Sequence, residues 1–162
     1  MAAPPPYDRR ALWLRRGVLV VIVGAGVSAI LWWVLAWIST PGTVGGLQLA
    51  LGKKVYDAQC AACHGVNLEG QPNWRQRLPN GMLPAPPHDA SGHTWHHPDR
   101  QLFDITKFGT AALAPPGYKS AMRGFGDVLS DTEIRASLIY IQSRWPKNIR
   151  ARQARISGRT GF

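Results

Sequence analysis

The two cysteines of this chain stand together in the sequence Cys60-Ala61-Ala62-Cys63-His64. Two thiols three residues apart, followed directly by a histidine, form the attachment pattern of c-type haem. The thiols can reach the two vinyl groups on one side of a porphyrin, and the imidazole of His64 then points at the iron. A chain with this motif has to fold around a large apolar ring, which restricts its fold more than any other feature.

Three other kinds of site use paired cysteines, and the sequence favours none of them. A disulfide between residues three apart is geometrically strained, and a thioredoxin-like redox pair needs a βαβ context, which is absent here. A zinc site needs a second pair of ligands, and His93, His96 and His97 are present to supply one. Zinc is therefore the strongest alternative to haem at this motif.

Residues 17–38 form an apolar run without a charge. At about 1.5 Å per residue, a helix over this run covers roughly 33 Å, enough to cross the core of a bilayer. Four arginines precede the run and the next charge is Lys53, so the positive-inside rule places residues 1–16 in the cytoplasm. We predict a single-pass transmembrane helix in a bacterial inner membrane, with membrane lipid around it and the rest of the chain in the periplasm.

A cleaved signal peptide is the alternative to this anchor, with Val34 and Ala36 as the small residues before the cleavage site. The apolar run is longer than the roughly 7–15 residues of a signal-peptide core, which favours a retained anchor. Covalent haem attachment takes place outside the cytoplasm, so either interpretation puts the cysteine motif in a suitable compartment.

Beyond this segment the sequence predicts an all-α domain. Pro41 and three glycines within residues 39–46 predict a short irregular linker. Three main helices are expected in residues 47–145: over 47–59, over 99–108, and after Ser130, which forms a capping box with Glu133. The inward side chains expected in the first helix are Leu47, Leu49, Leu51, Val55 and Tyr56. The long loop over residues 65–97 needs something to pack on, and a haem would supply it.

The second axial ligand of a haem iron has to come from elsewhere in the chain. The available donors are Met82, Met122, His88, His93, His96 and His97. Met122 lies in a glycine-containing loop just before the final helix, where the loop can cover the opposite face of the haem. A thioether ligand favours Fe(II) and raises the potential, which suits an electron carrier. We therefore predict His64 and Met122 as the iron ligands.

These features together make residues 47–145 similar to class I c-type cytochromes, in particular small bacterial monohaem ones with a membrane anchor. The shared positions are Gly52, Tyr56, the cysteine motif, Met122, Phe125, and residues 129–134 and 138–141. The resemblance implies one covalently bound haem c, with thioether bonds to Cys60 and Cys63 and with Tyr56 and Phe125 in its binding site. One departure is Arg123, since the family often has proline after the ligand methionine.

The same resemblance implies two details of geometry. Gly52 would let the first helix cross closely over the final one near Tyr140. A proline carbonyl would accept a hydrogen bond from Nδ1 of His64, and Pro84, Pro86 and Pro87 are equal candidates for it.

The resemblance implies single-electron transfer in a periplasmic electron-transport chain, by a tethered carrier or a fixed subunit of a respiratory or photosynthetic redox complex, and no enzyme activity of its own. Donors would be a quinol–cytochrome c oxidoreductase or a dehydrogenase, and acceptors a terminal oxidase or a reaction centre. A haem enzyme or gas sensor with an open sixth coordination position is the alternative.

The histidine-rich loop over residues 88–97 has several interpretations. It could bind copper or zinc or form a distal haem pocket, but a polar loop of this kind more often hydrogen-bonds the haem propionates. Trp95 within it is expected to bind beside the macrocycle.

The formal charge of +10 is concentrated at the two ends of the chain: +3 in residues 1–44 and +6 in residues 144–162. The nearly neutral middle shows no basic face interleaved with aromatic residues, which excludes a nucleic-acid binder. The basic tail over residues 146–162 predicts a solvated segment or a short helix followed by disorder. A more specific interpretation is that this tail docks on acidic partner proteins or on anionic lipids.

Overall fold

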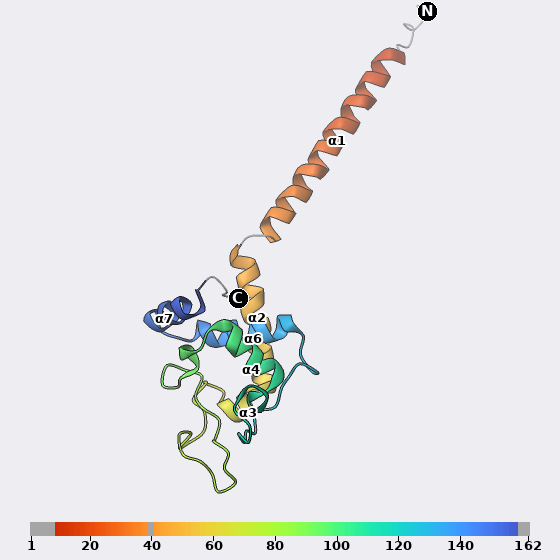
Figure 1. Cartoon of the computed structure of the whole chain (residues 1–162). Helices are drawn as coiled ribbons and strands as arrows, with labels where there is room; N and C mark the ends of the chain where they lie inside the picture. The colour runs from red at the N-terminus through yellow and green to blue at the C-terminus, as the bar shows by residue number, and fades with distance from the viewer. Residues whose placement is uncertain (1–8, 39–40, 159–162) are drawn as a thin grey trace, which may run out of the picture. The chain divides into compact units, whose positions relative to one another are not determined.

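The computed structural model describes residues 9–38 and 41–158, with side chains described for residues 23–37 and 45–158 (Figure 1). The chain divides into two compact units, Met1–Val44 and Gly45–Phe162. In the first unit, α1 (Arg9–Ile38) contains the predicted transmembrane segment, but the side chains of residues 17–22 and 38 lie outside those described. Among the described residues, no helix is long and apolar enough to span a membrane.

The next helix, α2 (Pro41–Gln59), begins earlier than predicted, so the backbone of residues 41–46 is helical where an irregular linker was expected. Proline is well tolerated in the first turn of a helix because its missing N–H has no intrahelical partner there. Each glycine costs a helix only about 1 kcal/mol relative to alanine, so Gly42, Gly45 and Gly46 weaken this helix without stopping it. Residues 39 and 40 of the predicted linker lie outside the described part.

The second unit confirms the all-α prediction. The helices after α2 are α3 (Ala61–His64), α4 (Asp99–Phe108), α5 (Thr110–Leu113), α6 (Asp131–Ser143) and α7 (Lys147–Ser157), with a 3₁₀ turn η1 (Thr94–His96) (Figure 1). The described residues contain no strand, only an isolated bridge between Gly109 and Arg123. The three main helices predicted from the sequence correspond to α2, α4 and α6.

Side chains from these three helices form one hydrophobic core together with Ala61, Leu68 and Trp145, which lie outside them. Its buried members are Tyr56, Ala61, Leu68, Leu102, Phe103, Ile134, Leu138, Ile141 and Trp145. In α2, Val55 and Tyr56 are buried as predicted, whereas Leu47 and Leu49 are exposed, so the prediction for these two leucines is wrong. Both lie before Gly52, the point where α2 meets α6, and therefore fall outside the packed part of the helix.

Gly52 allows α2 and α6 to cross in backbone contact. A Cβ atom at this position would collide with the carbonyl oxygen of Ala136 and would lie 2.9 Å from Cβ of Tyr140. Neither atom can move away by a side-chain rotation, because one belongs to the backbone and the other is a Cβ atom. The close crossing expected from the family resemblance is therefore present.

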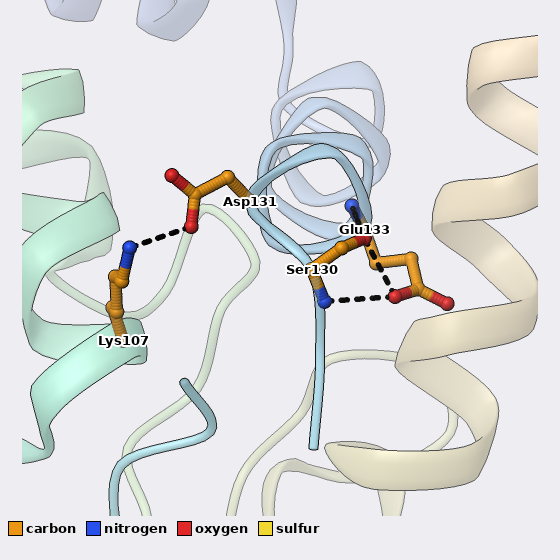
Figure 2. A network of polar contacts seen from close by, with 4 residues as sticks. All are labelled: Lys107, Ser130, Asp131 and Glu133. Atoms are coloured by element: carbon orange, nitrogen blue, oxygen red, sulfur yellow. Dashed lines mark hydrogen bonds and ion pairs between the residues drawn. The ribbon is translucent and has the colours of Figure 1, made fainter. Parts of the chain in front are cut away.

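The start of α6 is fixed by a capping box and an ion pair (Figure 2). The Ser130 backbone N–H donates to Oε2 of Glu133 at 2.9 Å, and the Glu133 N–H donates to Oγ of Ser130 at 3.3 Å. The bond from the Ser130 backbone N–H, followed by the bond that the Ser130 hydroxyl donates to the same carboxylate at 2.7 Å, lowers the pKa of Glu133 because both favour its charged form. Lys107 of α4 pairs with Asp131 at 2.7 Å, which ties the end of α4 to the start of α6.

The basic tail is a packed helix over most of its length, not a solvated segment. In α7, Gln153 and Ser157 are buried, and Ile149 packs against the core. Nε2 of Gln153 donates to the buried Asp99 carboxylate at 2.6 Å, and the Asp99 backbone N–H donates to Oγ of Ser157 at 3.0 Å. Polar contacts that the apolar pattern of the sequence does not reveal thus attach α7 to the start of α4.

We predict that Gly52→Ala destabilises the haem-loaded protein by about 2–3 kcal/mol, because the added methyl group forces the two helices apart. Chemical denaturation followed by circular dichroism measures this. The matched control is Gly46→Ala in the same helix, where a Cβ meets nothing within 4 Å. The control should gain up to about 1 kcal/mol from helix propensity. Equal stability of the two variants would contradict the close crossing.

We also predict that Gln153→Ala lowers stability by about 1–3 kcal/mol, since it removes a donor from a buried carboxylate. Arg155→Gln, on the exposed side of the same helix, should change stability by less than about 0.5 kcal/mol. Thermal unfolding of the two variants compares them directly. A wild-type melting temperature in Gln153→Ala would show that the contact of Gln153 with Asp99 contributes nothing to the stability of the domain.

Candidate haem-attachment site

The cysteine motif lies where α2 ends and α3 begins. Cys60 precedes α3, and its carbonyl accepts hydrogen bonds from the N–H groups of Cys63 at 3.1 Å and His64 at 2.9 Å. This turn brings both thiols onto one short segment, Cys60 partly buried and Cys63 exposed, and neither forms a disulfide. Burial raises the pKa of the Cys60 thiol to about 11, with a smaller contribution from Cys63.

His64 is buried and held in a defined tautomer. Its Nδ1 lies 2.8 Å from the carbonyl oxygen of Pro86. Because a carbonyl can only accept, Nδ1 carries the proton and Nε2 keeps its lone pair. Nε2 forms no hydrogen bond to any described residue. A histidine oriented by a carbonyl at one nitrogen is a typical metal ligand through the other.

This hydrogen bond also selects one of three prolines. The sequence leaves Pro84, Pro86 and Pro87 as equal candidates for the acceptor, and the structure assigns Pro86. Burial lowers the pKa of His64, partly offset by this bond, so the imidazole is neutral at neutral pH. A neutral imidazole is the form that ligates metal ions.

Trp95 carries a further sign that an acceptor group belongs in this part of the molecule. Its indole Nε1 is the one fully buried side-chain nitrogen or oxygen without a hydrogen-bond partner in the described part of the chain. Orphaned donors of this kind are rare in folded proteins. The carboxylates of a haem are acceptors, so an unpaired indole in a domain with a haem-attachment motif fits the group that the motif implies.

Tyr56 connects α2 to the residue that follows the proximal histidine. Its side chain is fully buried, and its hydroxyl donates to the carbonyl of Gly65 at 2.8 Å. Burial raises the pKa of Tyr56, which keeps the hydroxyl protonated and able to donate. Its ring lies tilted by 51° to that of Tyr140 of α6, with centroids 5.5 Å apart, and edge-on to His88 at 6.4 Å.

His88 has a role that the sequence did not indicate. Its ring stacks face to face on the His64 imidazole, with centroids 3.9 Å apart and planes inclined by 19°. Burial, followed by the nearby His64 and His93, keeps the pKa of His88 well below its usual value. Because its ring lies against that of His64, His88 would stand on the same side of a bound haem and would not supply the second iron ligand. The sequence alone does not indicate this position of His88. Only after Pro86 is identified as the partner of His64 does a residue two positions later become a candidate neighbour of the same ring.

The other histidines of the loop pair with aromatic rings. His93 stacks on Trp74 with centroids 5.4 Å apart, and His96 stacks on Trp95 at 3.7 Å. Among the residues that the structure describes, no three His, Cys, Asp or Glu side chains gather in a group that could hold a metal ion. The histidines here are part of the packing of the loop.

Met122 and Phe125 lie in the loop between α5 and α6, and both are partly buried. Hydrogen bonds from Phe125 N–H to the Thr106 carbonyl and from Gly126 N–H to the Lys107 carbonyl, both 3.0 Å, hold this loop against α4. The bridge between Gly109 and Arg123 holds its other part. No hydrogen bond or ring contact in the described part joins this loop to His64, and ligation by Met122 stays a prediction.

Comparison with known proteins agrees with this geometry. Residues 49–145 match the family described as Cytochrome c. A curated relative, cytochrome c-555 of Prosthecochloris aestuarii, is 32% identical over 80 residues, which cover 46% of this chain and 81% of the relative. No solved structure matches the chain. The family match spans most of the second unit and includes Cys60, Cys63 and His64, so the chain belongs to the cytochrome c family and is an electron carrier with covalently attached haem c.

Proposed function

We propose that this cytochrome transfers single electrons with His64 and Met122 as its two iron ligands. The observation that carries the proposal is the buried His64 ring, whose Nδ1 is bonded to Pro86 and whose Nε2 has no partner in the described structure. The haem supplies the one-electron chemistry when it is bound. The chain keeps His64 neutral, oriented and shielded from water, and the thioether of Met122 would favour an electron carrier over a centre with an open position for substrate.

The proposal includes a membrane anchor. The charge-free run over residues 17–38 and the arginines before it support a single pass, with residues 1–16 in the cytoplasm and the haem domain in the periplasm of a bacterium. An anchored carrier exchanges electrons with neighbouring membrane complexes. Donors would be a quinol–cytochrome c oxidoreductase or a dehydrogenase, and acceptors a terminal oxidase or a reaction centre.

The exposed side of α7 supports the proposal that the carrier docks on an acidic surface of a partner protein. Four exposed cations lie along it: Lys147, Arg150, Arg152 and Arg155. The helix has no acidic residue, and none of these cations forms an ion pair with a described residue. Arg152 lies over the Trp95 ring at 4.9 Å, so this charge is held beside the haem-binding loop. Apart from Ile156, α7 exposes no large apolar side chain, which favours a protein surface over insertion into lipid.

We predict that Met122→Ala abolishes the weak methionine-to-iron charge-transfer band of the oxidised protein and lowers its reduction potential, because a thioether ligand favours Fe(II). Absorption spectroscopy and redox titration measure the two effects. Met82→Ala, which removes the other loop methionine, should leave both unchanged. A wild-type protein without the band, together with binding of an added ligand to its iron, would favour a haem enzyme or gas sensor instead.

For the anchor, we predict that the haem of the full chain stays in the membrane fraction after alkaline washing. A chain starting at Pro41 behind a cleavable signal peptide should give a soluble haem protein. Mild detergent extraction then separates the two modes of action, because a tethered carrier comes away alone and a fixed subunit co-purifies with its complex. Soluble haem from the full chain, with its N-terminus beyond Ala36, would instead indicate a cleaved signal peptide.

A further inference from the structure

We propose that His88 is a positioning residue for His64, and that its stacked ring sets the tilt of the ligand imidazole and, through it, the reduction potential. This inference rests on the proposed ligation of the iron by His64. The cytochrome c family match accounts for the cysteines and for His64, and it assigns no role to the ring beside them.

The hydrogen bond to Pro86 alone does not fix the His64 ring. The angle at a hydrogen bond tolerates wide variation before the bond weakens, and the second side-chain torsion of histidine has a broad energy minimum. The ring can therefore tilt about its bond to Cβ while Nδ1 stays bonded to the Pro86 oxygen. A flat side chain against one face, at a centroid distance of 3.9 Å and an inclination of 19°, blocks that tilt on its side.

His88 can restrain the His64 ring in this way because three hydrogen bonds hold His88 itself. Its Nδ1 lies 2.8 Å from Oγ1 of the buried Thr94. Its backbone N–H donates to the Leu68 carbonyl at 2.8 Å, and its carbonyl accepts from Nε1 of Trp145 at 2.7 Å. The ring contact with Tyr56 adds a fourth neighbour from α2. A movement of His88 would break several of these contacts together.

The two restraints on His64 come from one short segment of the loop. Pro86 holds the edge of the imidazole and His88 holds its face, with a single residue between them in the chain. Partners that orient a metal-ligating histidine also adjust the electronic properties of the metal. The stack therefore offers the chain a way to tune the iron without changing either ligand.

The test compares four variants of the full, haem-loaded chain: His88→Phe, His88→Leu, Thr94→Val and His97→Ala. Phenylalanine keeps a flat ring against His64, whereas leucine fills similar space without a flat face. Thr94→Val removes the hydroxyl that holds the His88 ring. His97→Ala is the control, because it removes a histidine ring of the same loop whose partners are Gln101 and His93.

The readouts are the hyperfine-shifted haem-methyl resonances of the oxidised protein, which report the orientation of the ligand ring, and the reduction potential. We expect His88→Leu to change the methyl-shift pattern and to lower the potential, because looser cover admits water that favours Fe(III). Thr94→Val and His88→Phe both lose the bond between positions 88 and 94 but keep a flat ring against His64, so each should shift both readouts in the same direction by less. His97→Ala should keep the wild-type pattern and potential.

A folded His88→Leu protein with the wild-type pattern and potential would overturn the inference, since filling the space would then suffice. Equal changes in His88→Phe and His88→Leu would overturn it as well. Failure of the proposed function has a different signature, because the wild-type protein would then lack the low-spin spectrum of a haem ligated by both His64 and Met122. If His88→Leu does not fold, His88→Phe is compared with Thr94→Val. A larger change of the methyl-shift pattern and the reduction potential in His88→Phe than in Thr94→Val then contradicts the proposal.

Discussion

The hydrogen bond between Nδ1 of His64 and the carbonyl of Pro86 is the interaction on which the haem site depends. It fixes the tautomer and leaves Nε2 as the only nitrogen able to bind a metal. It also joins the short helix α3 to a loop that is distant in sequence and has little regular structure of its own. Because one end of the bond is a backbone carbonyl, its geometry depends on the path of the loop and not on the rotamer of a second side chain.

The path of that loop is held in turn by the C-terminal part of the chain. Trp145, at the end of α6, donates to the His88 carbonyl, and Gln153 of α7 donates to the His97 carbonyl at 3.3 Å. Asp99 accepts from both Gln142 and Gln153 at 2.6 Å, which links the end of the loop to α6 and α7 together. Buried polar groups that are fully paired in this way specify a single arrangement of the backbone.

Several of these features could be predicted from the sequence, and others could not, for identifiable reasons. The bounds of α4 and the cap of α6 follow from local signals, since Pro98, Gly109 and the Ser130 capping box act within one helical turn. The hydrogen bond of His64 to Pro86 and its stacking with His88 depend on how the loop folds back onto α3. The residues next to Pro86 and His88 in the sequence do not predict that path. The packing of α7 was missed because its buried face is polar, and hydrophobic periodicity detects only apolar faces.

The polar attachment of α7 has a consequence for how the molecule can vary. The helix holds to the domain through Gln153, Ser157 and Ile149, while its cations lie on the outside. The family match ends at residue 145, just before this helix. Apart from Arg152, which lies over the Trp95 ring, residues on its outer face can therefore be exchanged without disturbing the core or the contacts of His64. Under the proposed docking of α7 on an acidic partner, such exchanges would change which surface the carrier recognises and leave its redox centre as it is.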